Sequence, residues 1–158
     1  MLRIGIGSDI HRLVEGRPLV IGGVRIESEL GAEGHSDADV LVHALCDAIL
    51  GALALGDIGK HFPADEERWR NAESFIFLKY VVGLMKDKGF EIVNVDSTVH
   101  LEKPKLRPYI DEMRAGIAEV LETDPNNVNV KAKTGEGVDA VGERRAVRAD
   151  AVVMLAKV

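Results

Sequence analysis

The sequence is poor in cysteine, in aromatic residues and in net positive charge. Its 158 residues include one cysteine, Cys46, which excludes an internal disulfide and a cysteine-rich zinc module. Aromatic residues make up 4%, and acidic residues outnumber basic ones by 26 to 20, which argues against nucleic-acid binding. No run approaches the ~20 apolar residues of a membrane helix, and a strand-like pattern directly after Met1 predicts no signal peptide. We therefore expect a cytoplasmic protein with neither a nucleic-acid nor a membrane partner.

What the chain does contain is an alternation of strand-like and helix-like segments. Its 46% apolar and 29% charged residues are typical of one folded domain, here residues 1–158. Alternating apolar residues predict strands at 2–10, 18–26 with a bend at Gly22–Gly23, 90–101, 128–133 and 146–156. Helical spacing predicts helices at 37–55, 72–88 and 106–122, with loops at 56–71 and 134–145. This order predicts an α/β fold, an α+β sandwich in which helices cover one mixed β-sheet.

The first chemical signal is the pair Asp9 and His11 in the first expected strand. Positions i and i+2 of a strand point the same way, so the two side chains project together, on the face that also carries Gly5 and Gly7. A carboxylate and an imidazole are suitable ligands for a divalent metal. Such triplets are common, however, and on these residues alone a strand-end turn with a surface salt contact stays an open alternative.

The first expected helix is apolar on almost every face, which predicts burial in the core or in a subunit interface. Asp39, His43 and Asp47 nevertheless repeat on it at four-residue spacing and form one polar stripe. Buried polar groups must be paired or bind metal. Either His43 joins Asp9 and His11 in an open zinc site, with Asp39 or Asp47 orienting it, or it is a buried histidine hydrogen-bonded to a neighbouring aspartate.

The segment before this helix carries His35 and Ser36. Backbone N–H groups at a helix N-terminus favour anions, so these two side chains are candidates for binding a phosphate there. A capping role for Ser36 or Asp37 is a compatible alternative.

Several short motifs, taken together, are typical of one known family. They are Asp9-x-His11, His35-Ser36-Asp37-x-Asp39, His43-Ala44-Leu45-x-Asp47-Ala48, Gly56-Asp57-Ile58-Gly59, Phe62-Pro63, Lys103-Pro104-Lys105-Leu106, Val128-Asn129-Val130-Lys131-Ala132 and Thr134-x-Glu136. The order and spacing of these motifs extend across nearly the whole chain. By them the sequence resembles the 2-C-methyl-D-erythritol 2,4-cyclodiphosphate synthases of the non-mevalonate isoprenoid pathway.

The resemblance implies an activity, cofactors and partners. Enzymes of this family convert 4-diphosphocytidyl-2-C-methyl-D-erythritol 2-phosphate to the 2,4-cyclodiphosphate and release CMP, a phosphoryl transfer that depends on positioning and charge stabilisation. The implied cofactors are one Zn²⁺ per subunit and a Mg²⁺ or Mn²⁺ ion that bridges the substrate diphosphate. The implied partners are a cytidine-diphosphate-linked small molecule and further copies of the chain in a homotrimer, whose active sites take zinc ligands from one subunit and cytidine loops from the next.

The resemblance also implies roles for individual residues. Asp9, His11 and His43 would bind zinc, Glu136 would contact the second metal, and His35 and Thr134 would be catalytic. The implied substrate-binding residues are Ser36, Asp57, Gly59, Phe62, Leu101, Pro104, Lys105, Leu106, Lys133 and Thr134. For Phe62, pinning its loop to the core is an equally good interpretation.

The chain departs from the family pattern in three places, one of which is Ala64, followed by Asp65, where the family has an acidic residue directly after Phe-Pro. Lys133 and Gly135 stand where many members have threonines. Further on, Ala140 replaces an aromatic residue, and a glutamate and an arginine exchange positions as Glu143 and Arg145. These departures keep open a non-catalytic trimer that binds a nucleotide or an isoprenoid diphosphate. A zinc-dependent phosphohydrolase with the same three ligands is the other alternative, although a simple hydrolase does not need a cytidine loop.

Overall fold

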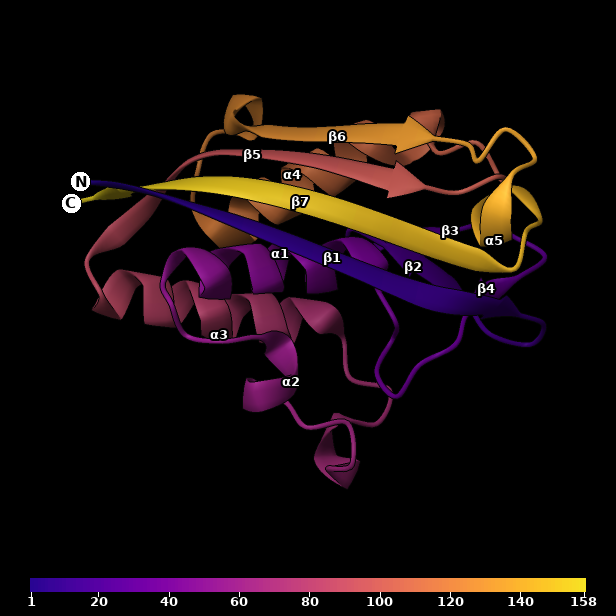
Figure 1. Cartoon of the computed structure of the whole chain (residues 1–158), viewed down its shortest axis with the longest axis horizontal. Helices are drawn as coiled ribbons and strands as arrows, with labels where there is room; N and C mark the ends of the chain where they lie inside the picture. The colour runs from indigo at the N-terminus through magenta and orange to yellow at the C-terminus, as the bar shows by residue number, and fades with distance from the viewer.

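A computed structural model describes all residues, 1–158, and is built around a five-stranded sheet (Figure 1). The strands lie in the order β4-β1-β7-β5-β6. Their bounds are β1 (Leu2–Val14), β4 (Gly31–Ala32), β5 (Phe90–His100), β6 (Val128–Lys133) and β7 (Ala146–Lys157). Strands β5 and β6 pair in parallel and the remaining pairs are antiparallel. The predicted mixed sheet is therefore confirmed.

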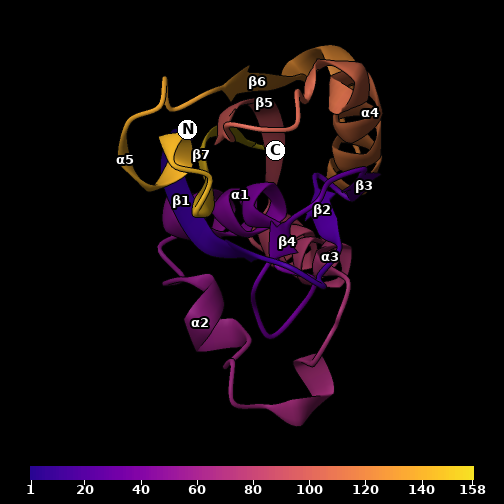
Figure 2. The ribbon, with the colours of Figure 1, turned by 90° about the vertical axis from the view of Figure 1, so that its right-hand side faces the viewer.

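Three long helices cover one face of this sheet, as Figures 1 and 2 show from two directions. They are α1 (Val40–Ala52), α3 (Ser74–Asp87) and α4 (Ile110–Leu121). The expected loops are not wholly irregular, because each contains a four-residue helix, α2 (Ile58–His61) or α5 (Asp139–Gly142). Single helical turns are too short to produce a periodic pattern, which is why the sequence did not predict them. None of the helices is long and apolar enough to cross a membrane.

Two of the expected strands differ in detail. The segment 18–26 is not one bent strand but a hairpin of β2 (Leu19–Ile21) and β3 (Val24–Ile26). Its turn residues Gly22 and Gly23 both have positive φ, 60° and 74°, the backbone that a tight two-residue hairpin turn needs. In β5 a register shift leaves Val93 37% exposed, so the expected alternation fails at that one position.

Helix α1 lies directly on the backbone of β1, because two glycines leave no side chain between them. A Cβ atom at Gly5 would stand 1.8 Å from the carbonyl oxygen of Ala48, and one at Gly7 would stand 2.0 Å from that of Ala44. All of the large apolar side chains of α1 are buried, as predicted. This close approach brings His43 of α1 under the same face of β1 that carries Asp9.

The other face of the sheet carries no helix; it is apolar on β1, whereas Asp96 of β5 and Lys131 of β6 form an ion pair on it. On β1 the side chains of Leu2, Ile4, Ile6 and Ile10 are between 56% and 72% exposed. Val152 of the adjacent strand β7, which pairs with Ile6, is 42% exposed. These exposed apolar side chains therefore gather on one part of the sheet face instead of being scattered singly over the surface.

Candidate active site

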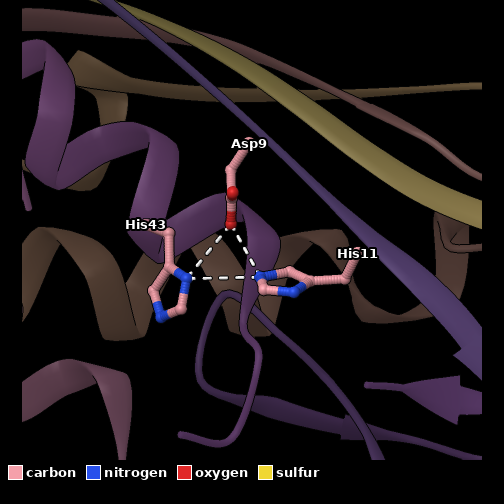
Figure 3. A group of neighbouring side chains, drawn as sticks. All are labelled: Asp9, His11 and His43. Carbon is pink, nitrogen blue, oxygen red and sulfur yellow. Dashed lines mark hydrogen bonds and ion pairs between the residues drawn. The ribbon is translucent and has the colours of Figure 1, made fainter. Parts of the chain in front are cut away.

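Asp9, His11 and His43 converge as the sequence predicted (Figure 3). The Oδ2 atom of Asp9 lies 2.8 Å from His11 Nε2 and 3.1 Å from His43 Nδ1, and the two nitrogens are 3.3 Å apart. Zinc bound tetrahedrally at about 2.0–2.1 Å from each ligand places ligand atoms about 3.3 Å apart. The donor set, two imidazoles and a carboxylate, and its triangle therefore fit a zinc ion with a fourth position open.

The side chains of this triad are 12% to 26% exposed, and their electrostatics favour a charged carboxylate. Burial alone would raise the pKa of Asp9, but the neighbouring imidazoles of His11 and His43 outweigh this effect and lower the pKa to about 2. Burial would likewise lower the pKa of His11, yet its hydrogen bond to Asp9 raises it above the ordinary value. Asp9 is thus ionised, as a metal ligand must be, at every physiological pH.

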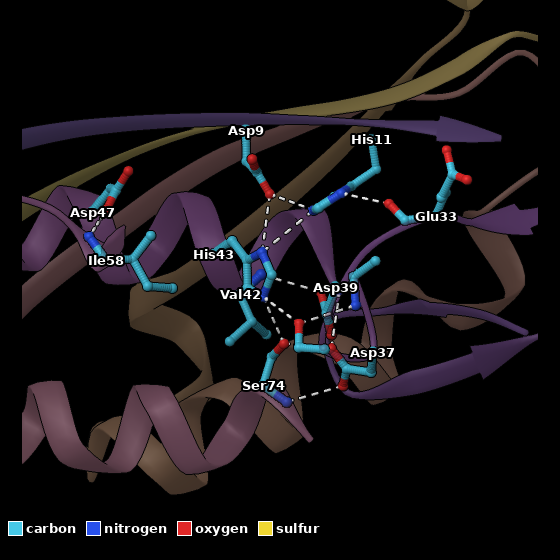
Figure 4. A network of polar contacts seen from close by, with 12 residues as sticks. Asp9, His11, Glu33, Asp37, Asp39, Val42, His43, Asp47, Ile58 and Ser74 are labelled. Carbon is cyan, nitrogen blue, oxygen red and sulfur yellow. Dashed lines mark hydrogen bonds and ion pairs between the residues drawn. The ribbon is translucent and has the colours of Figure 1, made fainter. Parts of the chain in front are cut away.

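The nitrogens of the two histidines that face away from the triad are held by hydrogen bonds (Figure 4). His11 Nδ1 donates to the backbone carbonyl of Glu33 at 3.0 Å. His43 Nε2 lies 2.8 Å from the hydroxyl of Ser74 and 3.3 Å from that of Ser36. Such partners fix the orientation of metal-binding imidazoles.

The expectation that Asp39 or Asp47 orients His43 is wrong. Asp39 is completely buried and caps α1, accepting from the backbone N–H of Val42 at 3.1 Å. It also accepts from the two glycine amides of the β2–β3 turn, so it joins that hairpin to α1. Asp47 accepts from the backbone N–H of Ile58 at 2.7 Å. The N-cap of α1 is thus Asp39, and the expectation that Ser36 or Asp37 caps this helix is wrong as well.

A cavity of about 220 Å³ adjoins the triad. Among its lining residues are His11, His35, Ser36, His43, Gly59 and Phe62. His35 donates through Nε2 to the carbonyl of Glu66 at 2.9 Å, which ties the loop after α2 to the loop before α1. Phe62 packs on Phe77 of α3 with a ring separation of 4.4 Å, as the interpretation that it pins its loop to the core predicts. It also lines the cavity, and its role in substrate binding stays a prediction.

Asp57, the remaining residue expected in this part of the site, is exposed and caps α2. Its carboxylate accepts from the backbone N–H of Lys60 at 3.0 Å. Sequence reasoning missed Trp69 and Phe77, whose side chains also line the cavity. It also missed Ser74, since nothing in the pattern of the helix 72–88 indicates that its first hydroxyl meets a histidine of another helix.

The expected nucleotide residues gather in a second groove, of about 260 Å³, formed by the segments after β5 and β6. Those that line it are Leu101, Pro104, Lys105, Leu106, Lys133 and Thr134. Glu102 joins the two segments, since its carboxylate accepts from the backbone N–H of Gly135 at 2.8 Å. Glu136 follows in a left-handed conformation, and its N–H donates to the hydroxyl of Thr134 at 3.2 Å.

The departure at Gly135 has a steric reason. A Cβ atom there would lie 2.5 Å from the backbone nitrogen of Gly142 in α5. A Cβ atom at Gly142 would in turn lie 2.4 Å from the carbonyl carbon of Gly137. The loop after β6 and helix α5 therefore pack backbone to backbone, and a threonine at position 135 does not fit this arrangement.

Within one chain the structure does not bring the metal triad and the nucleotide groove together. Both lie at the same end of the sheet, but the paired residues Asp9, Ala149, Val99 and Ala132 run in sequence across β1, β7, β5 and β6. At ~4.8 Å between neighbouring strands, β6 is roughly 14 Å from β1. Glu136 accordingly does not belong to the group of possible metal ligands, which is Asp9, His11 and His43 alone.

A metal centre with three protein ligands that opens into a cavity is the arrangement of a catalytic metal site. Residues 2–156 match the YgbB family, and the chain belongs to this family. A curated relative from Natranaerobius thermophilus, named 2-C-methyl-D-erythritol 2,4-cyclodiphosphate synthase, is 52% identical over 154 residues, which cover 98% of each chain.

Two solved structures share the fold of this chain. A CDP-bound form of 2C-methyl-D-erythritol-2,4-cyclodiphosphate synthase is 39% identical, with a TM-score of 0.90 over 98% of this chain and 100% of that one. The bifunctional IspDF from Campylobacter jejuni is also 39% identical and has a TM-score of 0.94; the match covers 98% of this chain and 42% of that longer chain. The family resemblance found in the sequence is therefore confirmed.

Proposed function

We propose that this protein converts 4-diphosphocytidyl-2-C-methyl-D-erythritol 2-phosphate to 2-C-methyl-D-erythritol 2,4-cyclodiphosphate and CMP, in the cytoplasm, as a phosphorus–oxygen lyase. The observation that carries the proposal is the triangle of Asp9, His11 and His43 beside a cavity, in a chain 52% identical to a relative named for this activity. The two alternatives, a phosphohydrolase and a non-catalytic binding trimer, have no such support from the relatives.

The metal-centred half of the site would hold the phosphates. Zn²⁺ bound by Asp9, His11 and His43, together with Mg²⁺ or Mn²⁺ near Glu136, would supply positive charge that stabilises the phosphoryl group during transfer. His35 and Ser36 line the cavity beside the triad, where the Ser36 hydroxyl would donate a hydrogen bond to a phosphate oxygen and His35 would stabilise the transferring group. Their contribution is to orient the attacking 2-phosphate toward the β-phosphorus of the diphosphate.

The other residues near this half would position the sugar-like part of the substrate. The carboxylate of Asp57 is exposed at the start of α2, where it can accept from substrate hydroxyls. Gly59 leaves the cavity wall open there, and Phe62 supplies an apolar surface that excludes water.

The nucleotide half would bind cytidine and its diphosphate. The backbone around Leu101, Pro104 and Leu106 would read the base edge, Lys105 and Lys133 would supply positive charge, and the hydroxyl of Thr134 would bond phosphate oxygens. The CDP-bound form of a relative with the same fold supports a nucleotide-linked substrate.

We further propose that the active unit is a homotrimer. The apolar part of the outer sheet face on β1, with Ile4 and Ile6 67% and 72% exposed, supports an interface that buries it. The separation of the two half-sites within one chain supports the same arrangement, because the nucleotide groove of a neighbouring subunit can complete the metal half. Each active site would then lie between two subunits.

The activity is tested by incubating the purified protein with the cytidyl substrate and Mg²⁺, and following the products by ³¹P NMR. We expect CMP and the cyclic diphosphate in equal amounts. His43→Ala should abolish the reaction, whereas His61→Ala removes an imidazole that lies outside the cavity lining and should not. Hydrolysis products alone would favour the phosphohydrolase, and tight binding without turnover would favour the non-catalytic trimer.

A further inference from the structure

The hydroxyl of Ser74 links a metal-facing histidine to a carboxylate (Figure 4). Ser74 is the first residue of α3 and is completely buried. Its Oγ atom lies 2.8 Å from His43 Nε2 and also bonds the Oδ1 atom of Asp37. Asp37 is held in place by two further donors, the backbone N–H groups of Ser74 at 2.9 Å and of Asp39 at 3.0 Å.

The available donors and acceptors determine the direction of each hydrogen bond that joins Asp37, Ser74 and His43. A carboxylate that receives these N–H groups only accepts, so the single hydroxyl hydrogen of Ser74 must go to Asp37. The Ser74 oxygen can then only accept from His43, which places a hydrogen on Nε2 of that imidazole. A neutral imidazole with hydrogen on Nε2 has its lone pair on Nδ1.

We propose that Asp37 and Ser74 form a hydroxyl relay that holds His43 in the Nε2–H tautomer and thereby commits its Nδ1 lone pair to the metal. This inference rests on the metal role proposed for His43. The Nδ1 atom faces the triad, 3.1 Å from Asp9 Oδ2 and 3.3 Å from His11 Nε2. His11 is fixed in the opposite tautomer by the Glu33 carbonyl, which receives its Nδ1–H.

The relay has a consequence for Ser36, whose hydroxyl lies 3.3 Å from the same His43 Nε2. Because that nitrogen carries a hydrogen, it is a donor toward Ser36 as well as toward Ser74. The Ser36 oxygen also receives the backbone N–H of Ala38 at 3.3 Å. Ser36 therefore keeps its own hydroxyl hydrogen for a ligand in the cavity that it lines, such as an anionic phosphate oxygen.

Ser74 is in these terms a positioning residue, because it acts on the metal through His43. The relay spans separate elements: His43 is on α1, Ser74 begins α3, and Asp37 lies in the segment before α1. Removing the Ser74 hydroxyl would leave His43 Nε2 with only the longer contact to Ser36 and would free the ring to change tautomer. Loss of such a partner typically weakens metal affinity by about 10–100-fold.

The test compares Ser74→Ala with the matched control Ser97→Ala. Ser97 is also buried and its hydroxyl also makes one 2.8 Å hydrogen bond, to the carbonyl of Asn129, but it has no contact with the triad. Zinc affinity is measured by competition with a chelator, and circular dichroism checks the fold. We expect Ser74→Ala to bind zinc about 10–100-fold more weakly than wild type, and Ser97→Ala to match wild type.

A second readout does not depend on the folding of any variant. In ¹⁵N-labelled, zinc-loaded wild-type protein, NMR correlations from the ring hydrogens of His43 should show a protonated Nε2 and a metal-bound Nδ1. A protonated Nδ1 on His43, or a folded Ser74→Ala variant with the zinc affinity of Ser97→Ala, would overturn the relay while leaving the proposed function intact. Failure of the wild-type protein to bind zinc would instead refute the metal centre on which both depend.

Discussion

The contact between α1 and β1 predicts a severe effect of a single methyl group. In Gly7→Ala the new Cβ atom would stand 2.0 Å from the carbonyl oxygen of Ala44 and 2.7 Å from the backbone nitrogen of Ala48. Both neighbours are helix backbone, which cannot swing aside as a flexible side chain can. To restore even a tight contact the helix must move away from the strand by about 1 Å, and overpacking of this kind costs about 1–3 kcal/mol of folding free energy.

This displacement acts on the site as well as on stability. His43 lies one residue before Ala44 on α1, while Asp9 lies two residues after Gly7 on β1, so the shift changes their separation of 3.1 Å directly. Metal sites tolerate ligand-distance errors of only about 0.2 Å. We therefore expect Gly7→Ala to lose most of its zinc affinity and to melt at a lower temperature, by roughly 2–4 °C per kcal/mol in a domain of this size.

The assay is calorimetry together with zinc analysis, and Gly51→Ala is its control. Gly51 is on the same helix but is exposed, and a Cβ atom there would meet only the Ile6 carbonyl oxygen at 3.8 Å. Replacing glycine by alanine inside a helix without a clash stabilises a protein by about 0.4–1 kcal/mol. If Gly7→Ala were as stable as wild type and bound zinc equally well, the argument that these glycines set the helix position would be refuted.

Three further predictions concern pH, the nucleotide loops and assembly. The hydrogen bond to Asp9 raises the pKa of His11 in spite of burial, so protons compete with zinc for this imidazole. The zinc affinity, measured by competition with a chelator, should therefore fall about tenfold for each pH unit below that pKa. Gly135→Thr, whose Cβ would lie 2.5 Å from a backbone nitrogen of α5, should cost about 1–3 kcal/mol of folding free energy, weaken CDP binding in calorimetric titration and leave zinc content unchanged. Ile6→Asp should turn the proposed homotrimer into monomers in sedimentation velocity, whereas Ile76→Asp, at a position 49% exposed on α3, should not; equal behaviour of the two variants would contradict the proposed sheet-face interface.

The parts of the site that share one element, or one strand and its covering helix, could be predicted from the sequence. The alternation of β1 places Gly5, Gly7, Asp9 and His11 on one face, and the two glycines leave room there for the backbone of a helix. The apolar helix carries His43 on its one polar stripe, and this side chain faces Asp9 and His11 of the strand. Here local periodicity alone determines the geometry.

The contacts that depend on how elements pack could not be predicted. Ser74 meets His43 across 31 residues of sequence, and only the packing of α3 against α1 determines that contact. Asp39 and Asp47 have the spacing of groups that orient a metal ligand. In the structure, however, their carboxylates accept hydrogen bonds from backbone N–H groups of nearby turns instead of from His43. A pattern shows which face a side chain is on; it does not show which of several donors comes within bonding distance.

The two half-sites are built in different ways, and this difference bears on the chemistry. The metal half is carried by β1 and by the buried helix α1, where the close backbone contact leaves little freedom of movement. The nucleotide half is carried by loops, joined to each other through the bond from the Gly135 amide to Glu102. Transfer of a phosphoryl group depends on charge held in place before the substrate arrives, whereas binding of a nucleotide needs only complementary loop surfaces. Because β1, β5 and β6 belong to one sheet, burying the apolar part of its outer face on β1 against another copy would also place the metal half of one subunit relative to the nucleotide half of the next, so that assembly and the geometry for catalysis would arise from the same contact.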